Sequence, residues 1–115
     1  MIRIKRIYEK ASPEDGCRVL VDRLWPRGVS KEEAAIHTWM REVAPSDALR
    51  KWVGKDTSKW EEFARRYREE LDDKPELLQA LKALEKEHGT LTLLYAKNDE
   101  VYNNANVLKG VLEAL

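Results

Sequence analysis

The chain has 115 residues, of which 37% are charged and 43% hydrophobic, and its 21 basic residues balance its 21 acidic ones. This length predicts one domain that spans residues 1–115. The composition is typical of a folded domain with a charged exterior and excludes an intrinsically disordered chain. A net charge of zero argues against non-specific binding of nucleic acid or of an anionic membrane.

A single cysteine, Cys17, leaves no partner for an internal disulfide, and no Cys/His cluster has the spacing of a metal site. We therefore expect no metal and no other cofactor, and we interpret Cys17 as a small buried strand residue. Residues 1–10 alternate charged and apolar side chains and lack the apolar stretch of a signal peptide. No run approaches the ~20 apolar residues that span a membrane. The sequence thus predicts a cytoplasmic protein with no membrane contact.

The first part of the chain predicts two strands. Residues 2–7 alternate apolar and charged side chains, which indicates a half-exposed strand at or near a sheet edge. Residues 12–16 have the composition of a turn. Residues 17–25, CRVLVDRLW, are richer in apolar and β-branched side chains and predict a central strand that stops around Arg23.

Short helices are predicted in the middle of the chain. Ser30 and Glu33 form a capping box that begins a helix. The length of this helix is left open, because residues 36–43 fit either a helix or a short strand. Ser46 or Asp47 then caps a further short helix.

The second half predicts two longer helices, a strand and a final helix. Apolar residues at helical spacing form one stripe over residues 60–71, and a second stripe closes at Gly89. Residues 90–96, TLTLLYA, are almost continuously apolar or β-branched, as in a buried parallel strand. Asn103 or Asn104 caps the last helix.

The order of these elements predicts the fold class. A helical segment between two buried strands indicates a parallel crossover connection. We therefore expect an α/β fold, a small layered domain with a three- to four-stranded, largely parallel sheet flanked by helices. Mixed pairing at the first strand is left open.

The carboxyl ends of the two buried strands are the expected ligand site, because open parallel sheets bind ligands beyond these ends. Arginine offers a planar fork to phosphate or carboxylate, and helix N-termini attract anions. The sequence therefore predicts a pocket for a small anionic ligand that bears phosphate or carboxylate. The candidate ligand-binding residues are Arg23, Trp25, Arg27, Gly28, Ser30, Tyr95, Lys97, Asn98, Asn103 and Asn104. Asp22 and Asp99 are the candidates for a general base or for orienting a hydroxyl group.

Other interpretations stay open. Arg23 also fits a structural role, salt-bridged to Asp22 or Asp99 at a strand end. An alternative function is a nucleic-acid-binding or regulatory interaction module, which would use a basic and aromatic cluster made of Arg50, Lys51, Trp52, Lys55, Lys59 and Trp60. The motifs of phosphate loops, dinucleotide sites, nucleophile elbows and zinc proteases are absent from the sequence. Whether the protein is an enzyme is therefore left open.

Three segments carry a resemblance to a known family: RVLVDRLWPRGVSKEEA, APSDALRKWVGKDTSKWEEFARRYREEL and LTLLYAKNDEVYNNANVL. With them the chain resembles the YeaO-like family, a prokaryotic group catalogued as domain of unknown function 488. The resemblance implies a small cytosolic α/β domain and supplies no activity, since the members are uncharacterised. Its motif residues in this chain are Asp22, Arg23, Trp25, Pro26, Arg27, Gly28, Pro45, Ser46, Arg50, Trp52, Trp60, Phe63, Tyr67, Tyr95, Lys97, Asn103 and Asn104.

The chain departs from the family pattern at two positions. An aromatic residue is common in the family where Cys17 stands, and a histidine is common where Tyr102 stands. The tyrosine argues against a histidine acting as acid or base at that point of this chain.

Overall fold

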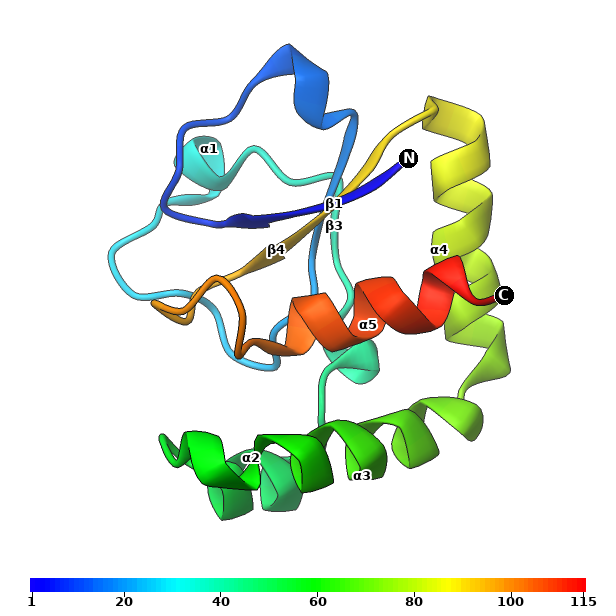
Figure 1. Cartoon of the computed structure of the whole chain (residues 1–115). Helices are drawn as coiled ribbons and strands as arrows, with labels where there is room; N and C mark the ends of the chain where they lie inside the picture. The colour runs from blue at the N-terminus through cyan, green and yellow to red at the C-terminus, as the bar shows by residue number, and fades with distance from the viewer.

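The protein is built around a four-stranded sheet, and the computed structural model describes all of residues 1–115 (Figure 1). The strands are β1 (Ile2–Arg6), β2 (Cys17–Leu20), β3 (Thr38–Trp39) and β4 (Leu91–Tyr95). They lie in the order β1-β4-β2-β3, and every neighbouring pair is parallel, including β1 with β4. The predicted α/β fold with a largely parallel sheet is confirmed, as is the place of the first strand at a sheet edge.

Five α-helices connect and flank the strands: α1 (Lys31–Ala34), α2 (Asp47–Val53), α3 (Trp60–Asp72), α4 (Pro75–His88) and α5 (Asn104–Glu113). Three 3₁₀ turns accompany them, at Pro13–Asp15, Arg41–Val43 and Thr57–Lys59. The side-chain oxygens of Ser30, Ser46 and Asn103 accept hydrogen bonds from backbone N–H groups in the first turns of α1, α2 and α5. The predicted starts of these helices are therefore confirmed. None of the helices combines the length and the apolar character needed to span a membrane.

The two faces of the sheet are covered unequally. Helices α2 to α5 contribute to the layer on one face, where Val19, Leu93 and Tyr67 belong to a core of 20 buried residues. On the other face Leu20 and Leu94 pack with α1 in a smaller cluster of 4 buried residues. Consecutive strand residues alternate between the two clusters, as the pleat of a strand requires. The helical layer therefore holds most of the apolar core.

The second strand is shorter than predicted. It ends at Leu20, so the prediction of a strand that stops around Arg23 is wrong. The backbone N–H of Val21 still donates to the carbonyl of Leu94 at 3.1 Å. After that point the side chain of Asp22, and no longer the backbone, bonds to the neighbouring strand segment. The chain is thereby free to turn away from the sheet.

The segment of residues 36–43, which fits either element in the sequence, contains a strand followed by a 3₁₀ turn. Helix α1 ends because Ala35 adopts a left-handed backbone conformation with φ 47°. The chain then enters the two-residue strand β3, which pairs with β2 at the sheet edge. The short-strand alternative is therefore the correct one.

The connections that leave β2 and β4 run to opposite faces of the sheet. Strand β2 leads to α1 on the face of the small cluster, whereas β4 leads to α5 on the helical face (Figure 1). Because β2 and β4 are neighbours, their carboxyl ends border a crevice of the kind in which open α/β sheets bind ligands.

Candidate functional site

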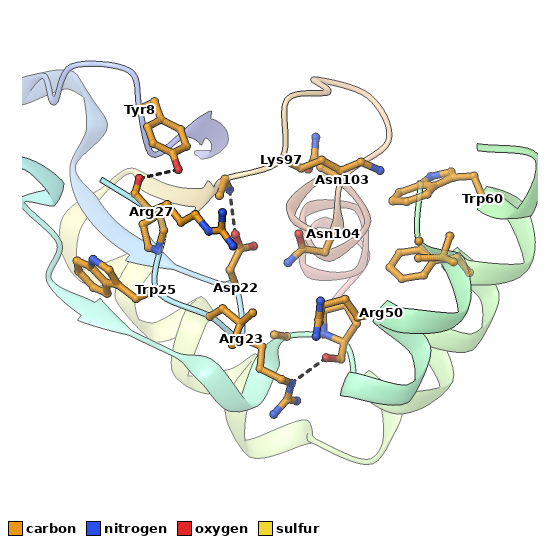
Figure 2. Close-up of a pocket in the computed structure, with 18 residues that line it drawn as sticks. Tyr8, Asp22, Arg23, Trp25, Arg27, Arg50, Trp60, Lys97, Asn103 and Asn104 are labelled. Carbon is orange, nitrogen blue, oxygen red and sulfur yellow. Dashed lines mark hydrogen bonds between the residues drawn. The ribbon is translucent and has the colours of Figure 1, made fainter. Parts of the chain in front are cut away.

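A cavity of about 380 Å³ opens at the carboxyl ends of β2 and β4 (Figure 2). Residues 22–27 after β2 form one part of its lining, together with Ala96 and Lys97 after β4. Asn103 and Asn104 at the start of α5 form another part. Residues of α2 and α3 complete it, together with Tyr8, Ala44, Pro45 and Gly54. The volume lies in the range of small-molecule sites, roughly 300–1,000 Å³.

Asp22 joins the two strand ends across the crevice. Its Oδ2 accepts a hydrogen bond from the backbone N–H of Ala96 at 2.9 Å, and its carbonyl accepts one from the indole N–H of Trp39 at 2.7 Å. Burial raises the pKa of Asp22 above its ordinary value, while the hydrogen bond from Ala96 and the nearby amide of Asn104 oppose that effect. Asp22 is the only acidic residue that lines the cavity.

Two arginines border the cavity without an ion pair. Arg27 is exposed, and its guanidinium makes no hydrogen bond within the protein. Arg23 donates from Nε to the carbonyl of Pro45 at 3.1 Å, which leaves its two terminal nitrogens available. The ion pairs of the chain involve other residues. The alternative of a salt bridge from Arg23 to Asp22 or Asp99 is therefore wrong.

Lys97 is a third cation without an ion pair. Its Nζ lies 4.9 Å from the centroid of the Trp60 ring, which is a cation–π contact. Burial lowers the pKa of Lys97, and the charge of Asp99 opposes that effect. A half-buried ammonium whose main contact is an aromatic face gains favourable electrostatic energy from an anion placed beside it.

The loop that carries Lys97 is anchored by Arg6 of β1. Arg6 donates from Nε and from a terminal nitrogen to the carbonyl of Ala96, at 3.3 and 2.9 Å, and from Nε to the carbonyl of Lys97 at 3.1 Å. The N–H of Ala96 donates to Asp22. Two side chains therefore hold both backbone polar groups of Ala96.

The two asparagines at the start of α5 have different roles. Asn103 is fully buried, its Oδ1 accepts from the N–H of Asn106 at 2.8 Å, and its Nδ2 donates to the carbonyl of Asp99 at 2.9 Å. Asn104 donates from Nδ2 to the carbonyl of Val21 at 3.0 Å, which ties α5 to the end of β2. Asn103 is therefore a capping residue, whereas Asn104 has an amide oxygen left for a ligand.

Five of the predicted site residues do not line the cavity: Gly28, Ser30, Tyr95, Asn98 and Asp99. Ser30 caps α1, and Tyr95 is buried in the main core. The Oδ1 of Asp99 accepts hydrogen bonds from the N–H groups of two following residues at 2.9 and 2.8 Å, which shapes the loop before α5. Of the two acidic candidates, the structure thus brings only Asp22 to the cavity.

Trp25 lines the cavity, but its ring is held by other contacts. Its indole N–H donates to the carbonyl of Val29 at 2.8 Å. The ring packs edge-on against Trp39 with centroids 5.4 Å apart and joins the smaller apolar cluster. Trp25 therefore forms part of the wall and does not offer a free stacking face.

The apolar side of the cavity is formed by residues of α2 and α3 that are not among the predicted ligand-binding residues, although Trp60 belongs to the second basic and aromatic cluster of the sequence. It contains Val53, Trp60 and Phe63, and the two rings stack with centroids 4.5 Å apart and planes at 27°. In the sequence these aromatic residues fit the buried stripe of a helix, which gives no sign that the first turn of α3 reaches the strand ends. Tyr8, whose hydroxyl donates to the carbonyl of Arg27 at 3.0 Å, has no sequence signal either.

Most of the second basic and aromatic cluster is engaged in contacts within the helices. Arg50, which borders the cavity, forms an ion pair with Asp47 at 2.6 Å. The Trp52 ring has two cations within cation–π distance of its centroid, Lys59 at 5.0 Å and Arg66 at 4.3 Å. These contacts explain the clustering of charge and tryptophan by local packing.

The fold and the site define a small α/β protein with a four-stranded parallel sheet and a cation-lined cavity at its carboxyl edge. The family model described as "Inactive DUF488-N3 subclade" matches residues 1–115, and the chain belongs to this YeaO-like DUF488 family. The uncharacterised protein YeaO of Escherichia coli is 38% identical over 114 residues, which are 99% of this chain and 98% of YeaO. The uncharacterised protein Rv3073c of Mycobacterium tuberculosis is 44% identical over 81 residues, 70% of this chain and 69% of its own length. No solved structure matches the chain significantly.

Proposed function

We propose that this protein binds a small anionic ligand, bearing phosphate or carboxylate, in the cavity at the ends of β2 and β4. The observation that carries the proposal is the presence of three cations without an ion-pair partner, Arg23, Arg27 and Lys97, around one cavity. With Arg50, four basic residues and one acidic residue line it. The local field therefore attracts anions although the net charge of the chain is zero.

We propose a binding protein rather than an enzyme. The cavity lining contains no serine, threonine, cysteine or histidine, and the one carboxylate in it is engaged by the N–H of Ala96. The word "Inactive" in the description of the subclade agrees with this proposal. The cytoplasmic location expected from the sequence stays a prediction.

The test compares Arg27→Gln with Arg68→Gln. Both arginines are exposed, and Arg68 on α3 lies outside this cavity, so the two variants change the net charge equally. Isothermal titration calorimetry with inorganic phosphate, ribose 5-phosphate and citrate at constant ionic strength measures anion binding. We expect Arg27→Gln to weaken binding roughly 10- to 100-fold, since charge-assisted hydrogen bonds contribute about 1.5–3 kcal/mol each.

The control variant Arg68→Gln is expected to bind like the wild-type protein. Equal weakening in the two variants would show that the anion is attracted by net charge alone. If the wild-type protein binds none of the three probes, the proposed function is wrong.

A further inference from the structure

The cavity has two chemically different sides, so a ligand that fills it carries more than an anionic group. Arg27 and Asp22 lie on one side, and Trp60 lies on the other, with Lys97 and Asn104 between them (Figure 2). From Arg27 to Trp60, basic side chains and hydrogen-bond acceptors therefore follow one another across the cavity, and an aromatic ring stands at the far side.

Asp22 and Asn104 each have an oxygen without a hydrogen-bond partner in the protein. Asp22 accepts from the N–H of Ala96 through Oδ2 and has the amide of Asn104 close to its carboxylate, and this amide donates through Nδ2 to the carbonyl of Val21. No fully buried side-chain polar atom of the chain lacks a partner, so the two remaining Oδ1 atoms have some exposure to solvent, and both residues line the cavity. Acceptors beside an anion site require hydrogen-bond donors on the ligand, and sugar hydroxyl groups supply such donors, as ribose does to acidic residues of dinucleotide sites.

Trp60 supplies an aromatic surface on the opposite side. Its ring is half-buried and is held in place by stacking on Phe63 at 4.5 Å between centroids. Lys97 lies over the ring with its Nζ 4.9 Å from the centroid. Tyr102 also packs edge-on against this ring, with centroids 5.5 Å apart. Stacking of a planar heteroaromatic ring on Trp60 is favourable and requires that Lys97 move from the ring toward the anion.

We propose that the ligand is a nucleoside monophosphate, an inference that rests on the proposed function. The phosphate contacts Arg27, the sugar hydroxyl groups donate to Asp22 and Asn104, and the base lies against Trp60. This order of groups follows the order of the side chains across the cavity (Figure 2). A cavity of about 380 Å³ lies in the size range of small-molecule sites and is compatible with a ligand of this kind.

Calorimetry with a dissected set of probes tests the inference. The probes are inorganic phosphate, ribose 5-phosphate, the four ribonucleoside 5′-monophosphates and the nucleoside of the tightest one, all at one ionic strength. We expect affinity to rise about tenfold from phosphate to ribose 5-phosphate through the hydroxyl contacts. Stacking of the base adds a further increase of about tenfold. The nucleoside, which lacks the phosphate, is expected to bind at least about tenfold more weakly than its monophosphate.

Two variants separate the base contact from the sugar contact. Trp60→Leu is expected to reduce the affinity of the best mononucleotide to that of ribose 5-phosphate and to leave ribose 5-phosphate unchanged. Trp52→Leu is the matched control, because Trp52 packs between Lys59 and Arg66 outside the cavity. Asp22→Asn keeps an acceptor for the N–H of Ala96 but removes the negative charge that attracts the sugar hydroxyl groups. This variant is therefore expected to reduce the preference for ribose 5-phosphate over phosphate.

The outcomes distinguish this inference from the proposed function. The inference is overturned if no mononucleotide binds more tightly than ribose 5-phosphate, or if Trp60→Leu weakens both equally, while anion binding itself survives. Failure of every anion to bind removes the proposed function as well. If Trp60→Leu does not fold, the tryptophan fluorescence of the wild-type protein is measured instead. Quenching by the mononucleotide but not by ribose 5-phosphate supports contact between the base and tryptophan. Equal quenching by both ligands overturns the inference.

Discussion

The carboxylate of Asp22 accepts a hydrogen bond from the backbone N–H of Ala96 at 2.9 Å and thereby fastens the end of β2 to the end of β4. The same carboxylate lines the cation-bordered cavity. Arg23 and Lys97 follow these two residues directly in the chain, so the bond also fixes the backbone positions from which two cations of the site extend. Fold and site therefore share one contact, and substitutions at Asp22 report on both.

Removing the acceptor at Asp22 is expected to destabilise the protein. Asp22→Ala leaves the N–H of Ala96 without its partner at a half-buried position, which costs about 1–3 kcal/mol of unfolding free energy. Asp22→Asn retains an oxygen for this bond and is expected to keep most of the stability at pH 7. Urea denaturation of the two variants measures the difference. Equal unfolding free energies would mean that the bond contributes nothing.

The contribution of Asp22 to stability is expected to depend on pH. Burial raises its pKa in the folded state, so the folded protein binds this proton more tightly than the unfolded chain does. The stability that Asp22 contributes is then present at low pH and decreases as pH rises from about 3.9, the ordinary aspartate pKa, through the raised value. As pH rises through this window, the unfolding free energy of the wild-type protein should therefore fall relative to that of Asp22→Asn. Above the window the difference between the two proteins should stay constant. Denaturation series at several pH values test this prediction. It is rejected if the wild-type protein becomes more stable relative to Asp22→Asn as pH rises.

A buried ion pair at the start of β2 is a second stability determinant. Arg18 donates to Oδ2 of Asp15 at 2.6 Å, and the two residues are 3% and 1% exposed. Lys5 lies 3.1 Å from the same oxygen, and the N–H of Ser12 donates to it at 3.0 Å. Although burial raises the pKa of Asp15, the hydrogen bonds from Ser12, Lys5 and Arg18 lower it overall.

Asp15→Asn is expected to destabilise the protein by about 3–5 kcal/mol at pH 7, because it leaves a buried guanidinium without its counter-charge. Since the folded pKa is lowered, the contribution of the carboxylate is present above the ordinary aspartate pKa and is lost as pH falls through the lowered value. The gap between the variant and the wild-type protein should therefore narrow below about pH 4. Thermal unfolding at several pH values measures the gap, with the exposed neighbour substitution Glu14→Gln as control. A gap that is the same at pH 3 and pH 7 argues against this assignment.

Gly16 is expected to tolerate no side chain. It has φ 62°, and a Cβ atom there would lie 2.4 Å from the carbonyl oxygen of Thr90. Gly28 has φ 74° but nothing within 4 Å of a Cβ atom, so it isolates the cost of the backbone conformation. We expect Gly28→Ala to cost about 1–2 kcal/mol and Gly16→Ala about 2–5 kcal/mol, because overpacking adds to strain at Gly16. Thermal melts compare the two, and similar losses would show that the contact with Thr90 relaxes.

The nucleic-acid alternative makes a prediction of its own. Arg50 and Lys51 form ion pairs with Asp47 at 2.6 and 2.9 Å, and Lys59 donates to the carbonyl of Trp52 at 3.1 Å. With these cations engaged, we expect no gel shift of a short duplex at low salt, where phosphate contacts are strongest. A shift that weakens with salt and is reduced by Lys51→Gln would favour the alternative function over the anion cavity.

The fold was predictable because its strands differ in pattern from its helices. The apolar runs near Val19 and Leu93 and the helical stripe before Leu71 require a sheet covered by helices, and short caps such as Ser46 mark the helix starts. The end of β2 was not predictable. In VDRLW the apolar pattern continues past the point where a hydrogen bond from the N–H of Ala96 to the side chain of Asp22 replaces the backbone ladder.

The site was predictable only on the side of the strand ends. Arg27 and Lys97 follow the two central strands, and parallel neighbours bring their carboxyl ends together. The position of Trp60 at the cavity depends on how the chain segment of α2 and α3 packs against the sheet, and no local sequence pattern specifies this packing. The ring of Trp25 is taken up by the smaller apolar cluster, since β3 places Trp39 beside it.

The two-sided hold on Ala96, by Asp22 at its N–H and by Arg6 at its carbonyl, has a kinetic consequence. The floor of the cavity is preorganised, so a ligand loses little affinity to the ordering of this backbone. Side-chain motion of Lys97 is the adjustment that remains, and loop and side-chain motions of this kind are fast compared with slow conformational steps of microseconds to seconds. Association should accordingly follow a single exponential whose rate rises linearly with ligand concentration, without the plateau of a slow conformational step.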